Sequence, residues 1–177
     1  RIVVSGATGG LGSISIKLLS HLGAEITAIT GKIHMKEYLI NLGASKVLNR
    51  EEFIASTKLP LTKKEFHGAI DTVGGEILSS IVARLEYGGT VAVCGNVAGP
   101  HFRTTVFPFI LRSNRLIGID SAECSIDQKK VIWQNYDSVW KLNSLNEFTR
   151  EVDLANLIPE FQKILKGDQI GRILVKI

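Results

Sequence analysis

The amino-acid sequence predicts an α/β fold: a doubly wound, parallel sheet of six strands in the order 3-2-1-4-5-6. Short apolar runs alternate with stretches whose apolar residues recur at helical spacing, and a glycine-rich turn joins the first run to the first such stretch. This alternation predicts right-handed crossovers and a sheet covered on both faces. With 177 residues, 45% of them hydrophobic, the chain is long enough to bury one core.

The predicted elements follow one another from the first residues onward. Three stretches have helical periodicity, Leu11–Leu22, Met35–Leu42 and Ile77–Leu85, and the first two stop at Gly23 and Gly43. Glycine is common just after the end of a helix because it adopts the left-handed conformation at no steric cost. The six strands are expected at residues 2–5, 25–30, 47–48, 68–72, 90–95 and 115–120.

The pattern changes after Asp120. Ser125 and Gln128 form a capping box for a helix with apolar residues up to Trp140, another helix is expected over 157–165, and residues 171–177 read as a final strand. We therefore expect the sheet domain at residues 1–121 and a C-terminal extension, with helices and a last strand, at residues 122–177.

The glycine-rich turn, "VVSGATGGLGS" from Val3, fits two registers. In both, the glycines let the backbone turn sharply toward a pyrophosphate, which lies on the free N–H groups of the next helix. One register, G-x-x-x-G-x-G, is that of short-chain dehydrogenases, which also need a Lys four residues after a Tyr. The residues at that distance from Tyr38, Tyr87 and Tyr136 are Leu42, Val91 and Trp140. The other register, A-x-G-x-x-G over Ala7, Gly9 and Gly12, is that of medium-chain reductases.

The residues after the second strand indicate which nicotinamide cofactor binds. NAD-selective sheets usually carry an acid there, which binds the ribose 2′-hydroxyl. This sequence has Thr30, Gly31 and Lys32, whose hydroxyl, amide and ammonium suit a 2′-phosphate, so we expect NADP(H). The alternative for Lys32 is an ordinary solvated lysine. Arg50 either flanks the adenine or the 2′-phosphate, or is an ordinary loop cation.

Several segments together resemble a known family. They are "GATGGLGS", "TGK", "EYLINLGASKVLNREEF", "GAIDTVGG", "YGGTVAVCGNVAG", "TTVFPFILRSNRLIGIDS" and "GRILVKI". Nearly end to end, the chain resembles the cofactor-binding, Rossmann-type half of zinc-independent, medium-chain quinone-oxidoreductase-like enzymes, most closely the acryloyl-CoA reductase subgroup. Residues 54–66 follow the family pattern poorly.

The resemblance implies hydride transfer from NADPH to an activated C=C bond or a quinone, such as acryloyl-CoA, an enone or another enoyl-CoA. It implies that Gly9, Gly10, Leu11 and Gly12 hold the pyrophosphate. It further implies that Thr30, Gly31, Lys32 and Arg50 hold the phosphorylated ribose, that Asn96 and Ile110 line the nicotinamide, and that Ser121 and Arg172 close over the cofactor.

The resemblance also implies an N-terminal domain that supplies the remaining substrate contacts, so no catalytic residue is assigned to this chain. The chain enters a strand directly after Arg1, and we expect it to be a piece of a longer protein. The strand at 171–177 is then expected to lack its partner strand. The edge strand at 115–120 favours a homodimer through sheet pairing.

Composition argues against several other functions. Lys plus Arg number 21 against 17 Asp plus Glu, a net charge of +4 without a basic run, so nucleic acid is not indicated. Cys94 and Cys124 have no CxxC spacing, and the four histidines are scattered, so no metal site is expected. No signal peptide or membrane-spanning run is found, and a cytoplasmic setting is predicted.

Other interpretations stay open. Asp71 either contacts a ligand or caps the following helix, and Cys94 is taken as a small buried side chain. The aromatic stripe Trp133, Tyr136 and Trp140 suggests a core or domain contact. A non-catalytic NADP(H) sensor is the alternative function, and a methyltransferase is disfavoured because Thr30 stands where an acid is usual.

Overall fold

The computed structural model describes all 177 residues and confirms the predicted sheet. All neighbouring strands are parallel, and their order is β3-β2-β1-β4-β5-β6. The order reverses between β1 and β4, where helices on opposite faces leave a crevice in such folds. The strands are β1 Ile2–Val4, β2 Ile26–Thr30, β3 Lys46–Asn49, β4 Phe66–Asp71, β5 Leu85–Val93 and β6 Arg115–Gly118.

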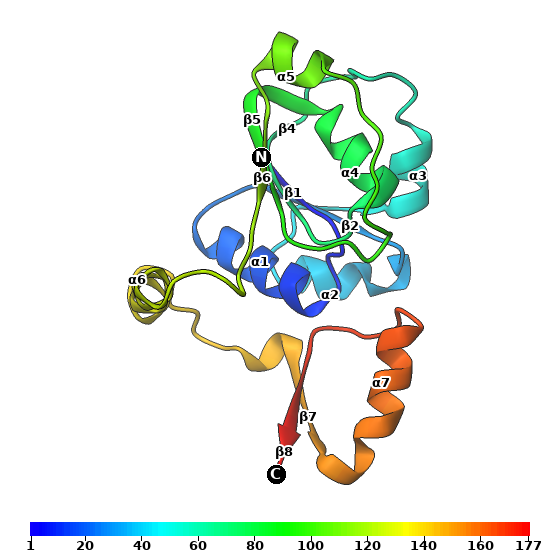
Figure 1. Ribbon diagram of the computed structural model, residues 1–177. Coiled ribbons are helices and arrows are strands. Elements are labelled where there is room, and N and C mark those ends of the chain that lie inside the picture. Colours follow the sequence, from blue (N-terminus) through cyan, green and yellow to red (C-terminus); the bar gives the residue numbers. More distant parts are fainter.

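Helices cover both faces of this sheet (Figure 1). Helices α1 and α2 pack on one face, and α3 and α4 pack on the other. A short 3₁₀ helix, η1, leads into α2, and α5 precedes the edge strand β6. The bounds are α1 Gly10–His21, η1 Ile33–Met35, α2 Lys36–Asn41, α3 Arg50–Ala55, α4 Gly75–Val82 and α5 Phe107–Arg112.

The core is divided by the sheet into two clusters. Successive residues of a strand point to opposite faces, so Val3 packs in the cluster with α3 and α4, whereas Val4 packs in the cluster with α1 and α2. In β2, Ala28 and Ile29 divide in the same way. Each strand of the centre is therefore buried on both sides, as in other parallel sheets.

A polar network joins the carboxyl ends of β1 and β4. Asp71 is fully buried and accepts hydrogen bonds from the Ser5 hydroxyl at 2.5 Å and from the Gly74 amide at 2.9 Å. The Ser5 hydroxyl in turn accepts from the Thr72 amide at 3.0 Å. Of the two interpretations of Asp71, the structure shows the structural one: its carboxylate closes the turn that precedes α4.

The C-terminal extension contains a second, two-stranded parallel sheet. Strand β7 (Thr149–Asp153) pairs with β8 (Arg172–Lys176), and α7 (Leu157–Leu165) connects them. The expectation that the final strand lacks a partner is therefore wrong. The sequence "TREVD" of β7 carries too little apolar character to be recognised as a strand on its own. Two further 3₁₀ helices, η2 Asn146–Phe148 and η3 Leu154–Asn156, flank β7.

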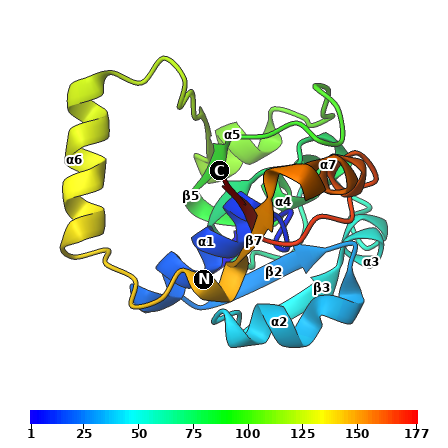
Figure 2. The ribbon, with the colours of Figure 1, turned by 90° about the horizontal axis from the view of Figure 1, so that it is seen from below.

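Helix α6 (Ile126–Asp137) stands apart from the sheet domain (Figure 2). None of its residues is buried, and the rings of Trp133, Tyr136 and Trp140 form a column with 5.8 Å between successive ring centroids. The Ser125 cap is present, because its hydroxyl accepts from the Gln128 amide. No helix of the structure has the length and apolarity that crossing a membrane requires.

Several element boundaries differ from the prediction, and two of these differences have a clear cause. Leu85 begins β5, since it lies opposite Phe66 in the sheet register, although its spacing from Ile81 also fits a helix. Helix α6 ends before Trp140, because the Ser138 hydroxyl bonds the carbonyl of Gln134 and the chain turns there. The six-residue helices α3 and α5 were not expected, and both are shorter than a recognisable periodic pattern.

The Asp71 network allows a test of stability. Replacing Asp71 by Ala leaves the Ser5 hydroxyl and the Gly74 amide without their acceptor inside the protein, and we expect the free energy of unfolding to fall by about 2–4 kcal/mol. Urea unfolding followed by circular dichroism measures this loss. Asp137→Ala is the matched control: its carboxyl lies on the surface of α6, and we expect a change below about 0.5 kcal/mol. An equal loss of unfolding free energy in the two variants would contradict the structural role of the Asp71 carboxylate.

Candidate functional site

The glycine loop leaves β1 and presents free amides at the start of α1. Gly6 has a φ of +58°, and its carbonyl oxygen accepts from the Gly9 amide at 2.9 Å. A Cβ at Gly12 would lie only 2.3 Å from the same carbonyl oxygen. No side chain caps α1, no acid lies in its first turn, and the amides of Gly10, Leu11 and Gly12 have no acceptor within the protein. This positive helix end is open to an anion.

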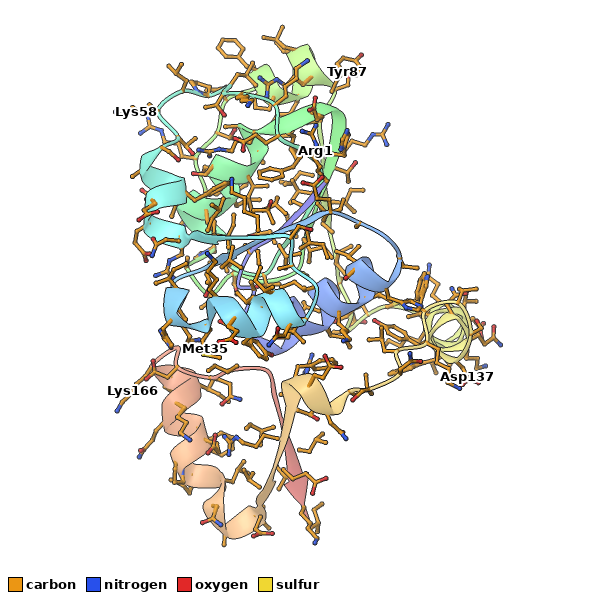
Figure 3. The ribbon with its side chains drawn as sticks, turned by 180° about the vertical axis from the view of Figure 1, so that it is seen from behind. Arg1, Met35, Lys58, Tyr87, Asp137 and Lys166 are labelled. Atoms are coloured by element: carbon orange, nitrogen blue, oxygen red, sulfur yellow. The ribbon has the colours of Figure 1, made fainter.

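A cavity of about 460 Å³ adjoins the loop at the carboxyl ends of β1 and β2. It brings together five of the residues expected to bind the cofactor, which are Gly9, Thr30, Gly31, Lys32 and Arg50. They converge because the carboxyl ends of parallel strands meet at one edge of the sheet. Residues of the C-terminal extension, Lys166 to Gln169, form the opposite wall. Lys166 and Met35 mark the two facing segments in Figure 3.

Three cationic residues line this cavity: Lys32 and Arg50 on the sheet side and Lys166 on the C-terminal loop. The Lys32 ammonium donates to the carbonyl oxygen of Gln169 at 2.9 Å and to the Thr8 hydroxyl at 3.4 Å. Partial burial lowers the pKa of Lys32, the charge of Asp168 opposes this shift, and Arg50 adds to it. The Arg50 guanidinium lies against Gly31, where a Cβ would be 3.1 Å from its nitrogen, and it pairs with Glu51 at 2.6 Å.

The C-terminal segment is bound directly to the glycine loop. The Gly171 amide donates to the Thr8 carbonyl at 2.8 Å, and Gly171 forms a parallel bridge with Gly9. Gly171 has a φ of +59°, and a Cβ there would lie 2.2 Å from the Phe148 carbonyl oxygen, so only glycine fits. The Arg172 side chain lies over Gly10, 3.0 Å from where a Cβ would be, so the structure brings Arg172 to the loop as expected.

Two further cavities contain residues expected to bind the cofactor. One, of about 480 Å³, lies between Gly10, Leu11, Arg172 and the apolar side of α7. The other, of about 500 Å³, lies at the carboxyl ends of β5 and β6 and includes Asn96 and Asp120. Ser121 follows directly in an exposed turn, in which the Asp120 carboxylate accepts from the Ala122 amide at 3.0 Å.

Cys94 lies beside Asn96 but has the properties of a structural thiol. Its Sγ donates to the Asp71 carbonyl at 3.3 Å. Burial, and secondarily the charge of Asp71, raise the pKa of the thiol. A raised pKa disfavours the reactive thiolate. No group of three or more His, Cys, Asp or Glu side chains is placed to bind a metal ion.

Ile110 does not join the other expected residues. It lies in α5, next to Arg112, whose guanidinium donates to the carbonyls of Ala83 and Leu85 where β5 begins. Asn96 follows the other end of the nine-residue β5. Leu85 to Val93 lie opposite Phe66 to Asp71 of β4, with a register shift between Phe66 and Gly68. At about 3.3 Å per residue, the two ends are roughly 17 Å apart. The fold of the chain therefore does not bring Ile110 beside Asn96, because a helix that directly precedes a parallel strand lies at the amino end of the sheet; the assignment of Ile110 to the nicotinamide stays a prediction.

The sequence reasoning missed the residues that the C-terminal loop contributes. Thr8 stands between the glycines of the loop and carries no signal of its own. Asp168 and Gln169 lie more than 130 positions from Lys32 in the sequence. The only sequence signal was the pair Gly171–Arg172, which predicts a tight approach but not the location of its partner. The position of Asp168 and Gln169 in the site is set by the packing of the C-terminal extension against the sheet domain.

Comparison with known proteins places the chain in a family. A family model described as "Zinc-binding dehydrogenase" matches residues 10–136, which is most of the chain. The chain belongs to the zinc-binding dehydrogenase family. Within this family, AcuI of Escherichia coli, provisionally named an acrylyl-CoA reductase, is 42% identical over 178 residues, covering all of this chain and 54% of AcuI. The acrylyl-CoA reductase AcuI of Ruegeria pomeroyi is 34% identical over 176 residues, covering 99% of this chain and 53% of its own length.

Solved structures of the family agree with the fold. Escherichia coli YhdH, crystallised with bound NADPH, superposes with a TM-score of 0.92 at 41% identity, covering 99% of this chain and 54% of YhdH. Bacillus subtilis YhfP, crystallised with NAD, superposes with a TM-score of 0.94 at 39% identity, covering 100% and 54%. The chain thus spans about half the length of the relatives that it matches.

The close approach of Gly12 to Gly6 gives a test of the loop. An Ala side chain at position 12 must displace the Gly6 carbonyl, and we expect Gly12→Ala to lower the free energy of unfolding by about 1–3 kcal/mol despite the better helix propensity of Ala. Gly118→Ala in β6 is the control, since nothing lies within 4 Å of the added Cβ. Denaturant unfolding of both variants measures the difference. A Gly12→Ala protein as stable as the control would show that the loop is not tightly packed.

Proposed function

We propose that this chain is the NADP(H)-binding half of an oxidoreductase that reduces an activated C=C bond or a quinone, with acryloyl-CoA as a candidate substrate. One observation carries the proposal. The free amides at the start of α1 directly follow Gly9, which lines a cavity with the cations Lys32, Arg50 and Lys166, while β2 itself ends in Thr30 without an acid. The groups that can bind a diphosphate and the groups that can bind a 2′-phosphate thus lie next to one another.

The residues present fit this cofactor. The amides of Gly10, Leu11 and Gly12 would hold the pyrophosphate, and the absence of a side chain at Gly9 and Gly10 leaves room for it. Lys32, Arg50 and the Thr30 hydroxyl would hold the phosphorylated ribose. Asn96 would lie near the nicotinamide, at the carboxyl ends of β5 and β6. Ser121 and Arg172 would contact the cofactor from the chain that follows β6. When bound, the nicotinamide supplies a hydride, and the protein orients it.

The relatives support the reaction class. YhdH was crystallised with NADPH, and the two AcuI proteins carry the name of an acrylyl-CoA reductase. This chain covers about half of each, so the acceptor site and any catalytic acid are proposed to lie in the half that it does not match. In this division, residues 1–121 bind the cofactor and residues 122–177 contact the other domain, with the exposed aromatic side of α6 available for that contact.

The oligomeric state and the cellular location of the protein stay predictions. Strand β6 is an edge strand and all four of its residues are exposed, which would allow a second copy of the chain to extend the sheet in a homodimer. A cytoplasmic location also stays a prediction, made from the cysteine usage.

Titration with NADPH and NADH tests the cofactor assignment. Followed by nicotinamide fluorescence, NADPH should bind more tightly than NADH. Lys32→Met should weaken NADPH binding by about tenfold or more and leave NADH within about twofold, because only NADPH has the phosphate that Lys32 attracts. Lys46→Met, at the amino end of β3, is the matched control. Equal weakening of both cofactors would contradict the assignment of Lys32 to the 2′-phosphate.

The pH dependence of the same titration follows from the pKa of Lys32. Burial lowers this pKa, so the ammonium of the free protein loses its proton below the usual value of about 10.4. Only the protonated form attracts the phosphate. NADPH affinity should therefore fall as pH rises through the lowered pKa, and this fall should be absent in Lys32→Met and for NADH. A pH-independent NADPH affinity up to pH 10 would contradict this role of the charge.

The reductase itself is tested on a protein that carries this chain together with the half that its relatives have in addition. NADPH oxidation that depends on acryloyl-CoA, an enone or a quinone is the expected result. Tight NADPH binding without oxidation by any of these acceptors would contradict a reductase and favour the non-catalytic NADP(H) sensor.

A further inference from the structure

An acidic residue reaches the ribose end of the cavity from the far end of the sequence. Asp168 lies in the loop after α7 and lines the same cavity as Thr30, Lys32 and Arg50. Two hydrogen bonds fix this loop. The Asp168 amide donates to the Lys163 carbonyl at 2.8 Å, and the Lys32 ammonium binds the carbonyl of the next residue, Gln169, at 2.9 Å. The acid that β2 lacks is thus present in the folded protein.

The Asp168 carboxylate is free to accept a hydrogen bond. It forms no side-chain hydrogen bond and no ion pair within 4.0 Å, because Lys32 donates to Gln169 and Thr8, while Arg50 pairs with Glu51. Its negative charge nevertheless acts on Lys32 across the cavity: it raises the pKa of Lys32 and so opposes the lowering caused by burial. A carboxylate in this position repels a phosphate dianion and attracts a hydroxyl donor.

Gln169 supplies an independent observation. Its side-chain oxygen Oε1 is buried and is the one buried side-chain polar atom of the chain without a hydrogen-bond partner. Its Nε2 donates to the Ile170 carbonyl at 2.9 Å, which fixes the orientation of the amide. Gln169 also lines the cavity, and a buried acceptor without a donor is unfavourable, so a donor group of a ligand that reaches Oε1 would stabilise it. A ribose hydroxyl can donate to it, whereas a phosphate dianion cannot.

We propose that Asp168 is a specificity-determining residue at the ribose end of this site: its carboxylate accepts a hydrogen bond from the 2′-hydroxyl of NADH and opposes the 2′-phosphate of NADPH. Lys32 and Arg50 on one wall, and Lys166 on the other, attract the 2′-phosphate, whereas Asp168 opposes it. The site takes both cofactors, and its preference for NADPH is smaller than the cations alone would give. This inference rests on the proposed function, because it concerns the same dinucleotide site.

The test compares Asp168→Asn with the unmodified chain in titrations with NADPH and NADH. The quantity of interest is the ratio of the Kd for NADH to the Kd for NADPH. Removing the charge should raise this ratio about tenfold, through tighter NADPH and weaker NADH binding. Asp127→Asn is the matched control, because it removes the same charge from α6. A purely structural effect on the loop would change both affinities together and leave the ratio unchanged.

The outcomes separate this inference from the proposed function. A raised ratio in Asp168→Asn, with Asp127→Asn unchanged, supports the role of Asp168. If both cofactors bind but the ratio stays within twofold of that of the unmodified chain, Asp168 has no such role and the proposed function stands. If the unmodified chain binds neither cofactor, the proposed function is contradicted and this inference fails with it.

Discussion

Asp71 is fully buried, and its carboxylate accepts from the Ser5 hydroxyl at the end of β1 and from the Gly74 amide before α4. These bonds fix the two strands between which the strand order reverses. The chain that leaves β1 is held there, so that the next residue, Gly6, makes its turn with a positive φ at a defined place. The glycine loop, the free amides of α1 and the cavity at the end of β2 all depend on this fixed departure point.

The candidate site combines groups from two parts of the chain that the fold brings together. The sheet supplies the glycine loop and two of the cations, and the C-terminal extension supplies Asp168, Gln169 and Arg172. Lys32 links the two parts, because its ammonium donates to the Gln169 carbonyl. A ligand phosphate that binds the Lys32 ammonium must compete with the Gln169 carbonyl. Ligand binding and the position of the C-terminal loop are therefore coupled at Lys32.

Features with a local cause could be predicted from the sequence. The strands of the sheet, the glycine loop and the grouping of Gly9, Thr30, Lys32 and Arg50 follow from periodicity and from the rule that parallel strands end at one edge. The sequence motif around Ile110 carries no information on strand direction, which places α5 at the amino end of β5 and away from Asn96. Strand β7 and the approach of Asp168 depend on pairing and docking over long sequence separations, for which the sequence carries no local signal.

A crystal structure of the chain with NADPH tests the central claim most directly. We expect the pyrophosphate within hydrogen-bond distance of the amides of Gly10, Leu11 and Gly12, and the 2′-phosphate at the Lys32 ammonium, which then leaves the Gln169 carbonyl. A dinucleotide bound elsewhere, for example in the cavity between α3 and α4, with the glycine-loop amides unoccupied, would contradict it.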